Sequence, residues 1–450
     1  MSSKSHEMDL CSGSLWKKIF VYSVPLMFTN ILQVLFNMSD VAVVGKFAGA
    51  IALGSVGSTS ILVTLFTGIL LGLASGVNAL TALHIGSKDD EGLKRTVHTA
   101  VIICLAGGIL ITVFGILFSH NILALMNTKD ELIDGAVLYL RIYLLGMPAL
   151  GLYNFGNAVL SAAGDTKRPL YYLAFAGVVN VILNLFFVIV CHLGVALASM
   201  ISQFISAFLI LRALLTGKEK YCLRLSEIRF DKRKAVGILQ IGIPSAFQYS
   251  LFAFANLFVQ SSVNSFDHVL VEGNSAAANA DPLVYDMMAA FYTACSSFIA
   301  QNFGARKKKR ILQTYLICLF YSFITSLVLG VGIYLARYPF LYLFTSDKAV
   351  VEAGITRLSI MALSYSASAF MDASIAASRG LGKTAVPTFV VVMGSCVFRI
   401  IWIYTIFAYF HTIQSLYILY VFSWGITAIA ENIYFFHVYR HTLTEKKELC

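Results

Sequence analysis

The chain alternates between long apolar segments and short polar segments along its whole length. A helix needs about 20 apolar residues to cross the hydrocarbon core of a bilayer, and each apolar segment reaches that length. We therefore predict an all-α polytopic membrane protein with twelve transmembrane helices. The predicted spans are 18–45, 51–80, 97–118, 132–160, 169–191, 194–216, 237–264, 270–302, 311–335, 351–377, 387–410 and 413–439.

Composition strengthens this prediction. Of the 450 residues, 58% are hydrophobic and 12% are charged, and the mean hydropathy is +0.79. A soluble protein carries about twice that charged fraction. The polar N-terminal stretch lacks the short apolar region of a signal peptide, so we expect no cleaved leader. The eight cysteines show no metal-ligand spacing, and we expect most of them in apolar packing.

The basic residues are divided unevenly between the connecting segments. With a cytoplasmic N-terminus, 26 of the 33 lysines and arginines lie in cytoplasmic segments and 5, among them Arg357, in outer segments, while Arg141 and Arg399 lie within spans. An excess of positive charge is typical of cytoplasmic loops. We predict a multi-pass protein of the cell membrane with both termini in the cytoplasm. The net charge of +10 then indicates contact with anionic membrane lipids and not with nucleic acid.

The chain also repeats itself. Val24-Pro25 corresponds to Ile243-Pro244 in a second set of six spans. We predict an N-terminal six-helix bundle at residues 1–217, a basic cytoplasmic linker at 218–234 and a C-terminal six-helix bundle at 235–450. Six spans return the chain to its starting side, so the two bundles are parallel repeats, and we expect a central cleft between them.

Polar side chains inside the spans are the candidate functional residues, because a charged group in lipid needs a partner, a bound ion or water. Asp40 ends the first span, Asn180 and Asn184 share one helix face at positions i and i+4, and Ser199 lies on the next span. Together they suggest an oxygen-lined site for a proton or for Na⁺, with Asp40, Asn180 and Asn184 as sodium ligands. Asp40 at the membrane surface and asparagines that only join helices are the simpler interpretations.

The second half carries its own polar groups. Asp281 and Asp286 lie in the eighth span, Asp372 in the tenth and Arg399 in the eleventh. Pro282 predicts a kink in the eighth span, which suits an element that lines a cavity. The Arg399 guanidinium needs an acidic partner, and we expect it to be one of the three aspartates. A purely structural buried ion pair is the alternative.

Two further patterns concern packing and chemistry. Gly68, Gly72 and Gly76 recur at every fourth position of the second span and predict a groove for close helix packing. No HExxH, GxSxG, Walker or GxGxxG motif is present, so the usual local enzyme signatures are missing.

A series of short motifs is found in order between residue 18 and residue 440. They are Val24-Pro25, Asn37-Met-Ser-Asp40, Val44-Gly45, Leu138-Tyr-Leu-Arg-Ile-Tyr143, Leu152-Tyr-Asn-Phe-Gly156, Gly164-Asp-Thr-Lys-Arg-Pro169, Val179-Asn180, Gly242-Ile-Pro244, Gln301-Asn-Phe-Gly304, Leu343-Phe-Thr-Ser-Asp347, Met371-Asp372 and Arg379-Gly-Leu-Gly382. Through these motifs the chain resembles the bacterial branch of the multidrug and toxic compound extrusion (MATE) family. The resemblance implies two six-helix bundles in a V around a central cleft.

The resemblance also implies a cation-coupling site in the N-terminal half. In the family this site uses an aspartate matching Asp40, an asparagine matching Asn180, an aspartate matching Asn184 and a threonine matching Ser199. Because Asn184 replaces the aspartate, one carboxylate remains where the family has two. The choice between H⁺ and Na⁺ therefore stays open.

In the C-terminal half, Asp372 matches an aspartate that is linked to cations in some members, and Asp281 matches an acidic position of close relatives. The glutamate that those members carry in the seventh span has no counterpart here, because Phe252 stands near that position and Gln248 is the nearest polar side chain. The candidate residues of a substrate cleft are Asp281, Asp286, Asp372, Arg399 and Gln248.

We expect a secondary antiporter, without enzymatic activity or cofactor, that exports small and often cationic organic compounds as a monomer in exchange for inward H⁺ or Na⁺. A flippase for a lipid-linked precursor is the alternative of related architecture. It should line its cleft with arginine and lysine. With Lys18, Arg212 and Arg357 near the span ends counted in the adjoining segments, the spans hold only Arg141 and Arg399. An intramembrane enzyme would need a nucleophile or metal set at membrane depth, and a channel would need a filter-like loop; the sequence suggests neither.

Overall fold

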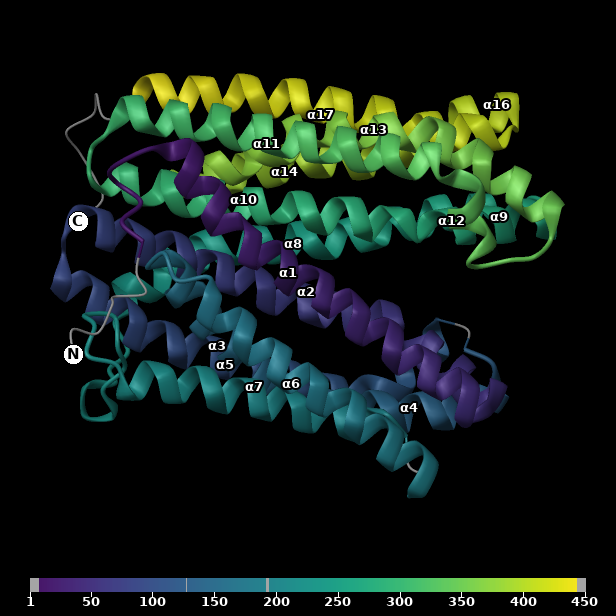
Figure 1. The fold of residues 1–450 in the computed structure, drawn as a ribbon, viewed down its shortest axis with the longest axis horizontal. Coiled ribbons are helices and arrows are strands. Elements are labelled where there is room, and N and C mark those ends of the chain that lie inside the picture. The colour runs from purple at the N-terminus through teal and green to yellow at the C-terminus, as the bar shows by residue number, and fades with distance from the viewer. Residues whose placement is uncertain (1–7, 127, 192–193, 443–450) are drawn as a thin grey trace. The chain divides into compact units, whose positions relative to one another are not determined.

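Helices make up all the regular secondary structure of the described residues, which are 8–126, 128–191 and 194–442 of a computed structural model (Figure 1). The α-helices are α1 (Leu15–Phe47), α2 (Gly49–Ser87), α3 (Asp90–Leu125), α4 (Asp130–Leu144), α5 (Met147–Ala162), α6 (Lys167–Leu185), α7 (Ala196–Thr216), α8 (Lys232–Val263), α9 (His268–Ala278), α10 (Ala280–Gly304), α11 (Lys308–Leu335), α12 (Arg337–Tyr342), α13 (Lys348–Gly380), α14 (Ala385–Val391), α15 (Phe398–Trp402), α16 (Ala408–Phe410) and α17 (Ile413–His441). Short π-helical segments are Phe186–Val190, Val392–Val397 and Ile403–Phe407, and Leu225–Glu227 forms a 3-10 turn.

The predicted all-α membrane architecture is confirmed. Within the described residues, 11 helices are long and apolar enough to cross a membrane, and the bent pair of α4 and α5 supplies a twelfth span. The axes of these two helices meet at 44°. The eighth predicted span consists of α9 and α10, which meet at Asn279, and Pro282 lies in the first turn of α10. Proline is tolerated there because the first turn of a helix needs no backbone donor.

The chain forms two compact units. The first unit contains Phe28–Ser250 and the chain up to Asp9, and the second contains Leu10–Met27 and everything from Leu251 onward. Both α1 and α8 are therefore divided between the units. The sequence repeat at 1–217 and 235–450 stays a prediction, since compactness divides the chain at other residues.

The first unit is built around α2, which packs against α3, α4 and α5. Val77, Val97, Phe155 and Ile210, from α2, α3, α5 and α7, are completely buried in its core. The predicted glycine groove of α2 holds the beginning of α8. A Cβ atom at Gly72 would overlap the α8 backbone, so only glycine allows this approach.

The predicted linker at 218–234 packs onto the first unit. Tyr221, Cys222 and Leu223 are buried in the core that contains α3 and α7. The backbone N–H of Arg224 donates to His98 Nε2 at 3.1 Å. This connection is consequently part of the fold of the first unit.

In the second unit, α13 is the central helix. It packs against α9, α10, α11 and α17, and α11, α13 and α17 run side by side in Figure 1. Its side chains are small where these helices meet: Ala369, Ala373 and Ala377 are completely buried. Small residues let helix backbones approach, so polar side chains on adjacent helices are brought within reach of one another.

Candidate cation and substrate sites

Three helices of the first unit bring the predicted coupling residues together. Asp40 lies near the end of α1, Asn180 and Asn184 lie one turn apart on α6, and Ser199 lies in the first turn of α7. The two asparagines and Ser199 are buried, whereas Asp40 is half-buried. Spacing of four residues places Asn180 and Asn184 on one helix face, as the sequence predicts.

These four side chains form one hydrogen-bonded cluster. Ser199 Oγ donates to Asp40 Oδ2 at 2.9 Å, and Asn184 Nδ2 donates to Asp40 Oδ1. Asn184 Nδ2 also donates to Asn180 Oδ1 at 3.1 Å, and Asn180 Nδ2 donates to Ser199 Oγ at 3.5 Å. The cluster links α1, α6 and α7, so the same contacts also join helices, as the simpler interpretation of the asparagines requires.

The hydrogen-bond donors described above for the Asp40 carboxylate are neutral groups, an amide and a hydroxyl. The ion pairs of the described residues do not include Asp40. Asn184 Oδ1 is buried and has no hydrogen-bond partner. Buried amide oxygens normally find a donor, so an oxygen left over beside a carboxylate marks a place where a proton or a small cation fits.

Two tyrosines near this cluster were missed by sequence reasoning. Tyr139 and Tyr143 of α4 stack with ring centroids 6.1 Å apart, and both lie close enough to Asp40 to interact with its charge. Ser202 also joins the cluster, because Asn180 Nδ2 donates to its Oγ at 3.5 Å. The i, i+4 spacing of the tyrosines was the available signal, but tyrosine is common in membrane helices.

In the second unit, Asp281 forms a buried ion pair with Arg357. Arg357 Nη2 donates to Asp281 Oδ2 at 2.5 Å, and Nη1 donates to Asn274 Oδ1 at 2.6 Å. Tyr365 OH donates to the other oxygen of Asp281 at 2.5 Å. The guanidinium of Arg357 therefore lies buried between α9, α10 and α13. Its assignment to an outer segment stays a prediction, because burial inside the protein does not place a residue relative to the membrane.

The predicted pairing of Arg399 with an aspartate is wrong for the described residues. Arg399 Nη1 donates to Asn256 Oδ1 at 2.9 Å, and Nε donates to Ser423 Oγ at 3.3 Å. Its guanidinium carbon lies 4.5 Å from the centre of the Tyr420 ring. An amide, a hydroxyl and an aromatic face thus contact the Arg399 side chain, which is only 1% exposed.

The remaining predicted cleft residues lie on three different helices. Asp286 is half-buried on α10, and Asp372 is buried on α13 with Oδ2 lacking a hydrogen-bond partner. Gln248 is buried on α8 in the first unit, whereas the other four predicted residues lie in the second. No group of three His, Cys, Asp or Glu side chains in the described part of the chain could hold a metal ion.

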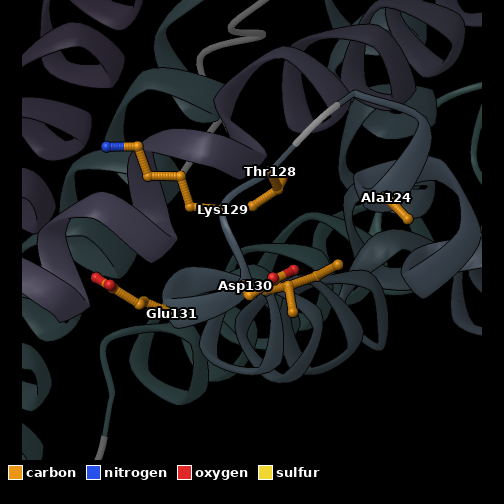
Figure 2. A pocket seen from close by; sticks show the side chains of 6 residues that line it. Ala124, Thr128, Lys129, Asp130 and Glu131 are labelled. Carbon is orange, nitrogen blue, oxygen red and sulfur yellow. The ribbon is translucent and has the colours of Figure 1, made fainter.

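An open depression lies at the connection between α3 and α4, away from all these residues (Figure 2). It is lined by Ala124, Thr128, Lys129, Asp130, Glu131 and Ile133. Figure 2 shows the extended side chains of Lys129, which precedes α4, and of Glu131 in the first turn of α4. We assign it no function, because none of the predicted site residues reaches it.

Comparison with known proteins connects this fold to a family. The MatE family model matches residues 25–186 and 244–405. Over 304 residues the chain is 30% identical to the probable multidrug resistance protein YpnP of Bacillus subtilis, covering 67% of this chain and 68% of that protein. It is 28% identical over 364 residues to the probable multidrug resistance protein YoeA of the same organism, covering 78% of each.

The fold also matches a solved structure. A MOP superfamily transporter from Pyrococcus furiosus superposes with a TM-score of 0.91 at 22% sequence identity, over 99% of this chain and 100% of that one. Sequence identity at this level supports a shared fold and nothing more specific. The two segments matched by the family model begin at Pro25 and Pro244, the prolines that the internal repeat pairs.

Proposed function

This chain belongs to the MatE family of membrane transporters, and from that premise we propose that it exports organic compounds in exchange for an inward flow of H⁺ or Na⁺. The family consists of transporters and not of enzymes. The names of the two Bacillus subtilis relatives support a range of small organic substrates, which we propose to be often cationic. We further propose a monomer with both termini in the cytoplasm, its basic face against anionic lipid.

The observation that carries this proposal is the neutral hydrogen-bonded cluster around Asp40. Ser199 and Asn184 donate to its two oxygens and so stabilise the ionised carboxylate. A proton or a cation on Asp40 competes with these donors, and its binding therefore loosens contacts between α1, α6 and α7. A ligand shifts a conformational equilibrium only by its different affinity for the two states, and this cluster provides such a difference.

Of the two ions, we propose the proton. Asn184 turns its NH₂ group toward Asp40 and Asn180, whereas a sodium ligand would present its oxygen. Rotation of the Asn184 amide would offer Oδ1, and Asp40, Asn180 and Asn184 could then supply oxygens to Na⁺. That arrangement would lose two hydrogen bonds, and the site would hold Na⁺ with a single formal charge.

The candidate cleft residues contribute less to this proposal than the Asp40 cluster does. Arg357 neutralises Asp281, so we propose only a structural role for Asp281, while Asp286 and Asp372 remain candidate residues for attracting a cationic substrate. Gln248 and Arg399 remain candidate cleft residues. A flippase is not favoured, since the arginines in the spans are already engaged: Arg141 Nε donates to Ser119 Oγ at 3.0 Å, and Arg357 and Arg399 have the partners described above.

Gradient-driven transport in proteoliposomes tests the proposal. A proton gradient and a Na⁺ gradient are imposed separately, and movement of a fluorescent organic cation is followed. We expect the proton gradient to drive transport and Asp40→Asn to abolish it while the protein remains folded. Glu131→Gln, an exposed carboxylate in the depression between α3 and α4, is the matched control and should transport normally. Full gradient-driven transport by Asp40→Asn would disprove the coupling role.

A further inference from the structure

The chain that leads into α1 is held against the beginning of α11 within the second unit. Arg310 Nη1 donates to the carbonyl oxygen of Gly13 at 3.1 Å, and Nη2 donates to that of Ser12 at 3.2 Å. Lys307 Nζ donates to the carbonyl oxygen of Cys11 at 2.8 Å. Because all three acceptors are backbone carbonyl groups, these bonds join the two helix beginnings without neutralising a positive charge.

An aromatic cluster joins the same two helices. The Trp16 ring meets the rings of Phe320 and Tyr321 edge to face, with centroids 5.3 and 5.4 Å apart. Tyr321 OH donates to the carbonyl oxygen of Trp16 at 3.3 Å. Trp16 and Phe320 are each 48% exposed, so the cluster has an open outer surface. An exposed tryptophan beside a tyrosine is typical of the level at which hydrocarbon meets the lipid headgroups.

The exposed faces of both helices change from basic to apolar along the chain. On α1 the exposed Lys17 is followed by the exposed Phe20. On α11 the exposed Lys309 is followed by Leu316 and Phe320, which lie about two and three turns further on the same helix face and are also exposed. A phospholipid presents the same order of properties, with a charged phosphate followed by hydrocarbon.

The basic edge of these helices, which we define as Lys17, Arg306 and Lys309, lacks an acidic partner within the described part of the chain. All three side chains are exposed, and the ion pairs among described residues include none of them. In the first unit, by contrast, Lys94 pairs with Glu227 at 2.6 Å. The first turns of α3 and α4 contain acidic residues, whereas those of α1 and α11 contain none. The basic edge therefore fits an anion supplied from outside the chain.

We propose that the basic edge binds the phosphate of an anionic phospholipid, whose acyl chains lie along the exposed side chains of Phe20 and Phe320. A phospholipid fits better than a free phosphate, because the apolar faces continue directly from the basic edge. This proposal deepens the contact with anionic lipid proposed above by giving it a place in the second unit. It depends neither on the coupling ion nor on the direction of transport.

Fluorescence quenching of Trp16 by brominated lipids tests this site. Trp402→Phe and Trp424→Phe leave Trp16 as the only tryptophan, and the full-length protein is placed in nanodiscs of phosphatidylcholine. A small fraction of the lipid is replaced by phosphatidylglycerol or phosphatidylcholine that carries bromine near the headgroup end of its acyl chains. We expect the brominated phosphatidylglycerol to quench Trp16 more strongly than brominated phosphatidylcholine at the same mole fraction.

Variants of the basic edge identify the charges that select the lipid. Lys17→Gln and Lys309→Gln should each lower the relative affinity for phosphatidylglycerol by about fivefold, because each removes one lysine from the headgroup. Lys348→Gln, an exposed lysine that begins α13, removes the same charge elsewhere and should leave the preference unchanged. Sodium phosphate should reduce the preference no more than sodium chloride of the same ionic strength does.

Equal quenching by the two brominated lipids would overturn the site. So would a preference that survives when Lys17→Gln and Lys309→Gln are combined, or an equal loss in Lys348→Gln. A loss specific to sodium phosphate would show a free phosphate as the occupant and would overturn the lipid. If the protein with one tryptophan does not insert, the quenching that Trp16→Phe removes from the natural protein reports the same side chain. No arm measures transport, so failure of this site leaves the coupling proposal standing, and failure of coupling leaves this site standing.

Discussion

Arg357 on α13 and Asp281 on α10 form an ion pair with 2.5 Å between Nη2 and Oδ2. The arginine side chain is 5% exposed and the aspartate side chain 37% exposed, so the charge that is costly to leave unpaired is that of Arg357. Asn274 of α9 accepts a second hydrogen bond from the same guanidinium. One arginine thus joins three helices of the second unit and removes Asp281 from the set of free carboxylates.

Loss of Asp281 should therefore destabilise the second unit more than loss of both partners. We expect Asp281→Asn to lower the free energy of unfolding by about 3 kcal/mol, because it leaves the Arg357 guanidinium buried without a counter-charge. Thermal unfolding of the detergent-solubilised protein measures this effect. Arg357→Met with Asp281→Asn should regain part of the stability. Lys348→Met, an exposed residue that begins α13, should change little; an equal loss in that control would contradict the ion-pair explanation.

Restoring a second carboxylate near Asp40 should change the ion requirement. Asn184→Asp adds a formal charge beside Asp40, and we expect about a tenfold lower half-saturating Na⁺ concentration, which corresponds to about 1.4 kcal/mol. Dye transport is measured against Na⁺ concentration at fixed pH. Asn184→Leu removes the amide without adding charge and should show no such gain. Saturable Na⁺ dependence in the parent, without any response to a pH gradient, would refute the proton as coupling ion.

The orientation in the membrane can be tested with thiol labelling. In a protein whose Cys191 and Cys450 are replaced by serine, an impermeant reagent added outside should label a cysteine at Lys129 or Lys348 but not one at Lys309. All three positions are charged, and the structure gives Lys348 and Lys309 exposed side chains. The reverse labelling pattern would place both termini outside.

The helix cap at the start of α3 predicts that stability depends on pH. Asp89 accepts a hydrogen bond from the Gly92 backbone N–H at 2.9 Å at the start of α3, and this bond lowers the pKa of the Asp89 carboxyl. A lowered pKa in the folded state means that the charged form stabilises the fold at neutral pH and that this contribution is lost on acidification. Asp89→Ala should cost about 1 kcal/mol at neutral pH.

The difference between the parent and Asp89→Ala should shrink as the pH falls below about 4, the ordinary pKa of aspartate. Asp89→Asn keeps a capping oxygen that does not titrate, and thermal unfolding should show a smaller cost than for alanine. A cost for Asp89→Ala that stays the same down to acidic pH would contradict a role for the charged carboxyl.

The spans and the Asp40 cluster could be predicted because their signals are local. Hydropathy marks each helix, and Asn180 and Asn184 are recognisable as amides spaced one turn apart in apolar sequence. The structure brings Asn184 into contact with Asp40, which lies far away in the chain, and Asn180 accepts a hydrogen bond from the same Asn184 amide. What the cluster does in transport remains the proposal made above.

The partners of buried charges could not be predicted, because they depend on which helix faces meet. Arg357 lies close to the beginning of α13, where hydropathy alone suggested a position outside the membrane. Arg399 was expected to need an acid, but Asn256 and Tyr420 satisfy it in the fold. Hydropathy indicates which segments are buried, but it does not indicate which side chains contact each other.

The close contact between α2 and the start of α8 has a consequence for how the protein is made. Gly72 faces the backbone of Ala246, yet these residues come from opposite sides of the connection at 218–234. If the gene were divided at that connection, the first product would enter the bilayer with a glycine face that its own helices do not fill. Such a face readily attracts other helices with small residues. Keeping both parts in one polypeptide supplies the correct helix at high local concentration during synthesis.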